Sequence, residues 1–214
     1  MVDGMGGSLT PFILRAHLRT PVIRRGHVTL DALLMSCLSC GDVSHLLLCQ
    51  DDLYFASSGF MVDAYATQKA AFVASLRPEH SPHWLDVLRP NTKDKDLRIG
   101  LARQREGGNI INAYTAIVAN AIEWYATGHM QDVLEAVKPA AFIGKRRTSG
   151  YGEVVRWEVE VGELDGLVGY ANDPLRPVPT ERWTLGGAWI PVEASWKAPY
   201  WDVRNRTRCF VPQV

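Results

Sequence analysis

The residues best suited to chemistry lie in one loop, from Phe142 to Val154, with the sequence FIGKRRTSGYGEV. Three glycines and three consecutive cations occupy this loop: Gly144, Gly150 and Gly152, and Lys145, Arg146 and Arg147. Glycine reaches positive φ and lets other groups approach the backbone closely, while lysine and arginine pair with phosphates. No acidic residue lies between positions 144 and 152. The composition therefore predicts a loop that holds a polyanion.

The segments on either side predict how this loop is positioned. Before it, apolar residues recur at the i, i+3, i+4 and i+7 positions of a helix, at Met130, Val133, Leu134 and Val137, and Pro139 ends the pattern. After it, apolar and charged residues alternate from Val155 to Val161, which is typical of a strand with one buried face. The expected order is helix, glycine-rich basic loop, strand.

The Gly144-Lys145 pair invites comparison with nucleotide-binding loops. A P-loop needs a glycine five residues before the Gly-Lys pair, follows a strand and opens a helix. Position 139 is proline and the order of elements is the reverse, so the P-loop and the dinucleotide fingerprint are both excluded. The alternative that stays open is a solvated turn in which the basic residues have no ligand.

Four cysteines are present, and three of them form a C-x2-C-x4-H-x3-C pattern with His45, at Cys37, Cys40 and Cys49. This spacing is one residue short of a zinc knuckle. However, Cys37 continues the apolar stripe of a helix expected from Thr29 to Cys40, with Thr29 as its N-cap, and a buried free cysteine behaves as a small hydrophobe. We therefore expect no metal and no cofactor.

Composition excludes few classes of protein. The 214 residues carry 23 basic and 23 acidic side chains, and 47% of the residues are hydrophobic, so one elaborated domain with a real core is expected. Basic residues nevertheless cluster along the chain, at positions 15–25, 98–105, 145–147 and 204–208, which allows one basic groove on a neutral particle. No apolar run is long enough to span a bilayer and no signal-peptide pattern is present, so a cytoplasmic protein without membrane contact is expected.

The order of predicted elements gives the fold class. Strands are expected at 11–23, 46–55, about 114–124 and 155–161, and helices at 29–40 and 130–137; residues 59–76 are ambiguous, and 114–124 also fit a helix. This is an α+β, ferredoxin-like (RRM-like) β-α-β-β-α-β domain over residues 9–164, with an irregular insertion at about 77–108. In this topology the basic loop lies near Arg15, Arg19, Arg24 and Arg25.

Residues 165–214 form a C-terminal extension that is rich in tryptophan and proline. The prolines are too frequent for long helices, so short strands and turns packed on the same domain are expected. The aromatic residues have two interpretations, which are stacking on bases and packing in a core.

The loop from Ile143 to Val154, with its Gly-Tyr-Gly ending, resembles the glycine-rich loop of the RAMP superfamily of CRISPR effector subunits. Within that superfamily, the chain is most similar to the fifth Cas family as found in type IV systems. Further resemblance lies in Pro21 followed by the TLDALL segment at 29–34, in Ala56-Ser57-Ser58, and in the PLRPVP segment at 174–179. The match covers roughly residues 12–180.

The resemblance implies a non-catalytic subunit that caps the five-prime handle of the guide RNA (crRNA). It also implies contacts with the large subunit and the backbone of a surveillance complex, close to the target DNA and its flanking motif. The loop residues that would hold the handle are Gly144, Lys145, Arg146, Arg147, Ser149, Gly150, Tyr151 and Gly152. Arg24, Arg25 and His27 are added because the predicted topology brings them near the loop, and Tyr151 has either a stacking or a packing role.

Two other functions stay open. Some relatives in the fifth Cas family cut guide precursors, and metal-free RNA cleavage needs a general base near the 2′-hydroxyl and a cation for the developing charge. His27, Tyr151 and Lys145 would serve if they converge, although the six histidines show no recognisable spacing. The third possibility is a ferredoxin-like protein whose loop binds a small anion or nothing.

Overall fold

The computed structural model describes residues 8–24, 26–75, 109–182 and 189–213 and shows an α+β chain with mostly antiparallel sheets. Its elements in chain order are β1 (Thr10–Leu18), β2 (Val22–Ile23), α1 (Leu30–Leu38), β3 (Cys49–Gln50), β4 (Leu53–Tyr54), β5 (Phe60–Val62), β6 (Ala66–Ser75), β7 (Asn109–Val118), β8 (Ala121–Gly128), α3 (Met130–Val137), the 3-10 turn η2 (Arg147–Ser149), β9 (Val154–Val161), β10 (Val178–Pro179), β11 (Val192–Ser195), the 3-10 turn η3 (Val203–Asn205) and β12 (Arg206–Phe210).

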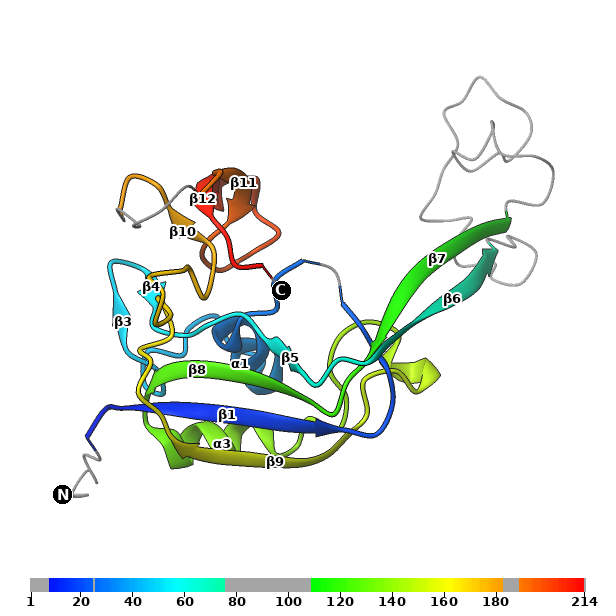
Figure 1. Cartoon of the computed structure of the whole chain (residues 1–214), viewed down its shortest axis with the longest axis horizontal. Coiled ribbons are helices and arrows are strands. Elements are labelled where there is room, and N and C mark those ends of the chain that lie inside the picture. The colour runs from blue at the N-terminus through cyan, green and yellow to red at the C-terminus, as the bar shows by residue number, and fades with distance from the viewer. Residues whose placement is uncertain (1–7, 25, 76–108, 183–188, 214) are drawn as a thin grey trace, which may run out of the picture. The chain divides into compact units, whose positions relative to one another are not determined.

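The central sheet has the strand order β5-β8-β1-β9, and every neighbouring pair is antiparallel (Figure 1). Its register places Leu14 of β1 opposite Trp124 of β8 on one side and Val159 of β9 on the other. Successive strand side chains point to opposite faces, so Leu14 and Trp124, both fully buried, mark the core face of the sheet.

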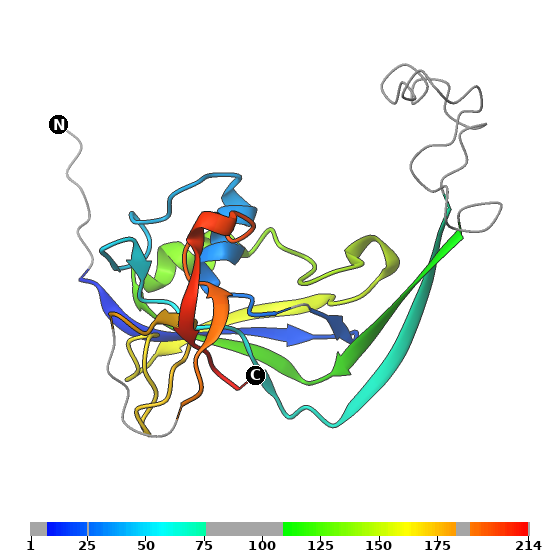
Figure 2. The same ribbon diagram turned by 90° about the horizontal axis from the view of Figure 1, so that it is seen from above.

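Helices α1 and α3 cover this core face (Figure 2). Helix α3 buries Val133 and Val137, as its helical spacing predicted, and α1 buries Leu30 and Leu34. Trp124 lies among them, and its indole N–H donates to the carbonyl of Val28 at 2.9 Å, so its only polar group is satisfied.

Strand β9 departs from strict alternation at its first residues. His17 of β1 lies opposite Arg156, whereas the next residue, Leu18, lies opposite Val154, so Val155 is an extra residue in a β-bulge. Val155 is consequently exposed, and Val154 packs on the core in its place. The prediction that Val155 and Val161 share the buried face was wrong, since Val161 is 73% exposed.

The strand predicted over 46–55 was also wrong. A tight hairpin occupies this segment: Gln50 of β3 lies opposite Leu53 of β4, and both turn residues, Asp51 and Asp52, have positive φ angles of 50° and 65°. Two such residues between paired strands are typical of a type I′ turn. The strand that joins the central sheet after α1 is β5, in the segment where the sequence was ambiguous.

The alternation over 114–124 belongs to two strands. Strand β7 ends at Val118 and β8 begins at Ala121, so the helical alternative for this stretch was wrong. The chain divides into two compact units, Met1–Gln68 with Ala116–Val214, and Lys69–Thr115. In the second unit the rings of Phe72 and Tyr114 meet edge to face at 5.8 Å. The insertion predicted at about 77–108 lies outside the described residues.

The C-terminal extension contains a small sheet with the order β10-β12-β11. It surrounds a second core cluster made by Leu53, Leu167, Trp196 and Cys209. Leu53 comes from the β3–β4 hairpin, so this cluster joins the extension to the first part of the chain.

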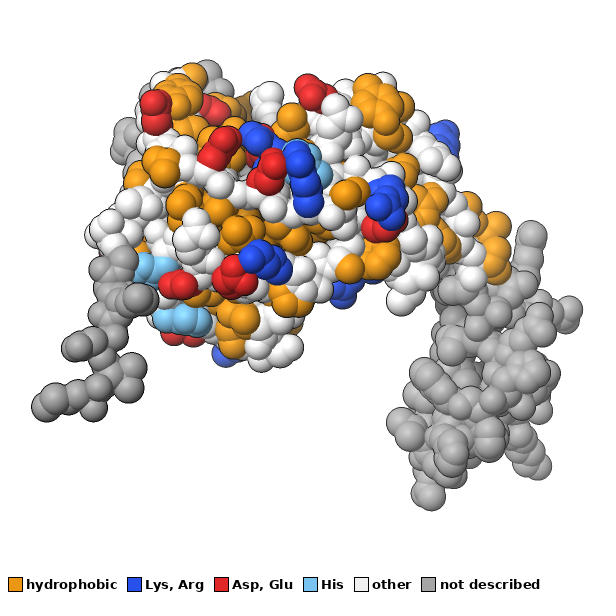
Figure 3. All heavy atoms as spheres, turned by 90° about the horizontal axis from the view of Figure 1, so that it is seen from below, with side chains coloured by type: hydrophobic (Ala, Val, Ile, Leu, Met, Phe, Trp, Pro, Cys, Tyr) orange, Lys and Arg blue, Asp and Glu red, His pale blue; other side chains and the backbone are white. Residues whose placement is uncertain are grey.

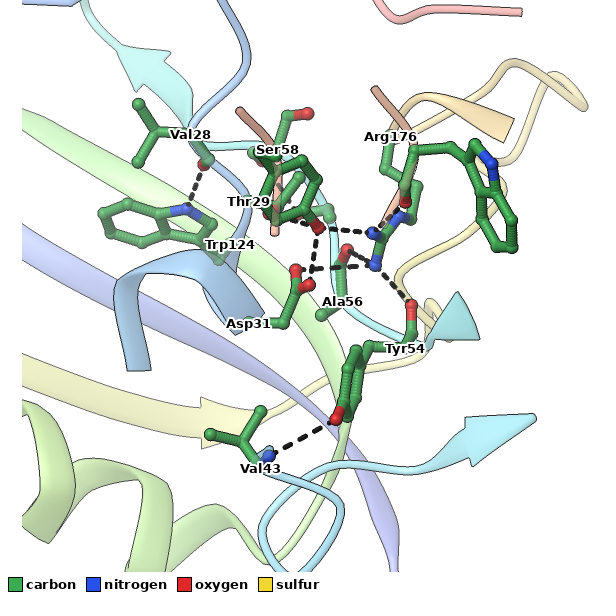
Figure 4. Close-up of polar contacts among 12 residues, drawn as sticks. Val28, Thr29, Asp31, Val43, Tyr54, Ala56, Ser58, Trp124 and Arg176 are labelled. Atoms are coloured by element: carbon green, nitrogen blue, oxygen red, sulfur yellow. Dashed lines mark hydrogen bonds and ion pairs between the residues drawn. The ribbon is translucent and has the colours of Figure 1, made fainter. Parts of the chain in front are cut away.

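A buried ionic cluster, the Arg176 cluster, makes a second connection; it consists of Arg176 from the extension, Asp31 from α1 and Tyr200 (Figure 4). The side chains of Arg176 and Asp31 are both 0% exposed and lie 3.5 Å apart. Arg176 donates to the carbonyls of Tyr54, Ala56 and Trp196 at 2.6–3.1 Å and to the Tyr200 hydroxyl at 2.8 Å.

Tyr200 completes the Arg176 cluster by donating to Asp31 at 2.5 Å. Burial lowers the pKa of Arg176, but the charge of Asp31 and the bond to Tyr200 outweigh burial, so the pKa lies above its ordinary value. The guanidinium therefore stays charged. Thr29 is the N-cap residue of α1, as predicted, but its hydroxyl donates to Tyr200 at 3.0 Å and does not cap the helix.

The described helices include none that is long and apolar enough to cross a membrane.

Candidate nucleic-acid interface

The basic loop is the end of a narrow hairpin that connects α3 to β9. Its stem is closed by backbone hydrogen bonds from Ile143 to the Gly152 carbonyl at 2.8 Å and from Val154 to the Ala141 carbonyl at 2.9 Å. These bonds fix the two ends of the loop independently of any side chain. The shape of the loop is therefore set by the backbone.

The same hairpin is fastened to β2 and to the turn that precedes it. The backbone N–H of Lys145 donates to the Ile23 carbonyl at 2.7 Å, and that of Gly152 donates to the Pro21 carbonyl at 2.9 Å. The hydroxyl of Thr20 accepts from the Glu153 N–H at 2.9 Å. The predicted proximity of the loop to the basic segment 19–24 thus arises from main-chain contacts.

Two of the three glycines are needed for this close packing. Gly144 has a φ of 86°, and a Cβ there would lie 2.5 Å from the Ile23 carbonyl oxygen. Gly152 has a φ of 73°, and its Cβ would lie 1.9 Å from the Ile143 carbonyl oxygen. Both glycines therefore let the loop approach the protein's own backbone, whereas a Cβ at Gly150 would meet nothing within 4 Å.

The exposed end of the loop carries its charge. Lys145, Arg147, Ser149 and Gly150 are exposed, and Arg146 and Tyr151 are half-buried. Within the described part of the chain, no carboxylate forms an ion pair with Lys145 or Arg147. Two cations are therefore presented to solvent from a fixed backbone, as phosphate binding requires.

Arg24 lies beside the loop but points inward. It lines a small cavity of about 10 Å³ together with Gly144, and its guanidinium donates to the Gly59 carbonyl at 3.0 Å. Burial lowers its pKa. Arg25, which was predicted beside it, lies outside the described residues.

His27 is half-buried in the same region. Burial, and then the charge of Arg24, lower the pKa of its imidazole, so the ring is neutral at neutral pH. Its Nδ1 atom is buried, and no hydrogen-bond partner for it occurs among the residues that the structure describes.

Arg15 and Arg19 were expected to share the surface of the loop. Arg19 does lie next to it and pairs with Glu153 at 2.9 Å. Arg15 lies on the sheet face opposite the helices, where it pairs with Glu123 at 2.5 Å and Glu160 at 3.1 Å. Its charge is thus balanced by the neighbouring strands.

The same sheet face carries further ion pairs. His17 contacts Glu158 at 2.5 Å, and Arg156 pairs with Glu158 at 3.0 Å. In Figure 3, acidic and basic side chains lie next to one another and form no patch of a single sign. The balanced face gives a phosphate chain little electrostatic attraction, and the exposed cations of the loop give more.

The cysteines of the zinc-like pattern lie on different elements. Cys37 is half-buried on α1, Cys40 donates to the Asp42 carbonyl, and Cys49 lies on β3. Over the described ranges, no group of three or more His, Cys, Asp or Glu residues is placed to hold a metal ion.

Sequence reasoning missed a groove between α1 and the segment that leads into the basic loop. This α1 groove has a volume of about 410 Å³ and is lined by Leu33, Ser36 and Cys37 of α1, by residues 139–142, and by Arg147 and Thr148. The only signal in the sequence was the aromatic Phe142 at the start of the loop, because the groove depends on how α1 and α3 pack.

The sequence was also compared with known protein families. A family model described as CRISPR type IV associated protein Csf3 matches residues 67–212, which is more than half of the chain. A comparison with curated proteins found no match. The chain therefore belongs to the family of the CRISPR type IV associated protein Csf3.

Proposed function

We propose that this chain is a non-catalytic RNA-binding subunit of a type IV CRISPR effector complex, and that its basic loop holds the five-prime handle of the crRNA. The observation that carries the proposal is the exposure of Lys145 and Arg147 on a loop whose backbone is fixed against β2. Cations on a preorganised backbone bind phosphates without a large ordering cost.

The RNA-binding residues in this proposal have different roles. Lys145, Arg146 and Arg147 contact phosphates, and the exposed Ser149 and Gly150 offer a hydroxyl and an open backbone. Tyr151 stacks on a base from its half-buried position. Gly144 and Gly152 keep the loop against β2, and Arg24 and His27 support the loop from beneath.

The fold supports a finer assignment to a ferredoxin-like RAMP domain of the fifth Cas family. In this assignment β1, α1, β5, β8, α3 and β9 are the β-α-β-β-α-β core, and the strand order β5-β8-β1-β9 with two helices on one face fits it. The remaining strands are additions to that core.

Membership of the family supports a proposal about the partners. We propose that the chain sits in an effector complex, where it contacts the backbone and large subunits and lies near the target DNA that flanks the guided segment. The C-terminal extension, fixed to α1 by the Arg176 cluster, gives such subunits a rigid surface to contact.

The decisive experiment measures binding of a labelled single-stranded handle RNA as a function of salt. The triple variant K145A/R146A/R147A is expected to bind more weakly, and its salt slope should fall by up to about 2, since each single-strand phosphate contact contributes about 0.7. The matched control is R204A/R206A/R208A, which removes the same charge from an exposed cluster in the extension.

The control should bind nearly as well as the native chain. Equal loss in both triple variants would show nonspecific attraction. Unchanged affinity and slope in the loop variant would reject the assignment of the loop.

A second candidate function is metal-independent cleavage of repeat RNA. It is favoured by the neutral His27, whose Nδ1 has no hydrogen-bond partner among the described residues. A neutral imidazole is a competent general base. Incubation of the purified chain with end-labelled repeat RNA in chelator tests it. Cleavage at one site that is lost in H27A would establish the enzyme, and intact RNA with binding retained would support the non-catalytic subunit.

A further inference from the structure

The α1 groove lies directly beside the basic loop and belongs to the same compact unit. One wall is formed by α1 and includes the buried Leu33, the exposed Ser36 and the half-buried Cys37. Phe142, Arg147 and Thr148 also line the groove. Its volume of about 410 Å³ falls within the range of roughly 300–1,000 Å³ that is usual for small-molecule sites.

The lining of the groove combines three kinds of group. Its walls are mainly apolar and include one aromatic ring, that of Phe142. Ser36 and Thr148 supply hydroxyls that both donate and accept. Among the described residues no carboxylate lines the groove, and Arg147 adds a positive charge to the lining.

The charge of Arg147 reaches into the groove, as Cys37 shows. Burial raises the pKa of the Cys37 thiol, and Arg147 opposes this rise. An occupant that is negative near Arg147 is therefore favoured, while the apolar walls favour a flat and uncharged body. A nucleotide has both properties, because it joins an uncharged base with polar edges to a phosphate.

We propose that the α1 groove accepts one unstacked base of the RNA strand whose phosphates are held by the loop, with Phe142 and the Arg147 guanidinium as stacking partners and the hydroxyls of Ser36 and Thr148 at the base edge. This inference rests on the proposed function of the loop. An apolar peptide helix would also fit apolar walls, but it would gain nothing from the cation Arg147 in the lining.

The test fills the groove without changing the charge of the loop. In the variant S36W, an indole on α1 would occupy the space that the base needs. The matched control is L38W, because Leu38 is exposed on the same helix and does not line the groove. Both variants are first compared with the native chain by thermal unfolding to establish that they fold.

Binding is measured with a set of handle RNAs that each carry one abasic position. In the native chain, one abasic position should weaken binding by about tenfold, which corresponds to the lower part of the range for stacking of a single base. S36W should bind the intact RNA about tenfold more weakly and should be insensitive to that abasic position. L38W should behave like the native chain.

Two further readouts sharpen the assignment. F142L should lose affinity for the intact RNA, and F142Y should keep it, because tyrosine preserves the stacking surface. Bound RNA should also slow the reaction of Cys37 with a maleimide, followed by peptide mass spectrometry, and leave unchanged the reaction of Cys49, a half-buried thiol on β3.

The failures of the two proposals are distinguishable. If the abasic set is uniform and S36W binds like L38W, while K145A/R146A/R147A still binds weakly, the groove takes no base and only this inference is overturned. If S36W retains RNA but fails to assemble with the other subunits, the groove docks a protein, which also overturns it. If the triple variant binds normally, the function proposed for the loop itself is wrong.

Discussion

Replacing Arg176 by methionine tests whether the Arg176 cluster holds the C-terminal extension to α1. The substitution keeps most of the apolar stem and removes the charge, which leaves Asp31 buried and without its cation. The carbonyls of Tyr54, Ala56 and Trp196 also lose their donor. Both partners of the ion pair are 0% exposed, so solvent cannot compensate for the loss.

The magnitude follows from this burial. Removing one partner of a buried pair costs about 3–5 kcal/mol. For a chain of this size, each kcal/mol shifts the midpoint of thermal unfolding by about 2–4 °C, so R176M should unfold roughly 6–20 °C below the native chain. The control R204M removes an arginine that is 86% exposed and whose ion pair, among the described residues, is with Asp202, so its midpoint should stay close to that of the native chain.

Thermal unfolding followed by circular dichroism measures both variants. The double variant D31N/R176M leaves no buried charge, so its loss of stability should be smaller than the sum of the two single losses. Equal midpoints for R176M and R204M would refute the reasoning, because they would mean that the Arg176 cluster contributes no more than a surface ion pair.

The remaining predictions concern the loop and two buried side chains. G152A should destabilise the chain and weaken RNA binding, because its Cβ would lie 1.9 Å from the Ile143 carbonyl oxygen. G150A meets only the strain of its φ of 83°, so it should lower the free energy of unfolding by about 1 kcal/mol. Denaturant unfolding compares the two variants. The pKa of His27 is lower in the fold than in the unfolded chain, so the unfolded chain binds more protons as pH falls below about 6.5. Stability should therefore decline from pH 7 toward pH 5, and H27Q should flatten this decline in urea unfolding; an equal slope in both proteins would contradict it. Burial raises the pKa of the Cys209 thiol to about 11, so at pH 8 maleimide should modify it only as fast as the fold opens, and rapid modification in the folded chain would contradict its burial.

The elements with strong local signals were predicted correctly. The helical spacing from Met130 to Val137 gave the bounds of α3, and the apolar stripe that begins at Leu30 gave α1 to within two residues at its end. Strand β9 was found because its half-buried Trp157 and Val159, which pack on the core, alternate with Glu158 and Glu160. In each case one face of the element packs on the core, so the period of burial is visible in the sequence.

The wrong predictions concern segments in which a tight turn or a β-bulge sets the conformation. Asp51 and Asp52 turn the chain with positive φ and break an apolar segment that otherwise resembles one strand. The exposure of Val155 follows from a bulge, whose position depends on pairing with β1. The domain boundary predicted near residue 165 stays a prediction.

Only some residues of the candidate site could be chosen from the sequence. The loop residues could be chosen because glycine and basic residues are concentrated there, and Arg24 and His27 could be added from topology. The α1 groove and the burial of Arg176 could not be found. Arg176 is bonded mainly to main-chain carbonyls from distant segments, and such acceptors leave no trace in residue identity.

The loop is attached to β2 through backbone groups, so its conformation does not depend on the side chains that carry its charge. Lys145 is held by its N–H and Gly152 by its N–H, so the side chain of Lys145 takes no part in either bond. Replacing the side chain at position 145 or 147 changes the charge on the loop surface and leaves the backbone hydrogen bonds intact. Substitutions at positions 145 and 147 can therefore change the charge that the loop presents to solvent while its backbone stays attached to β2.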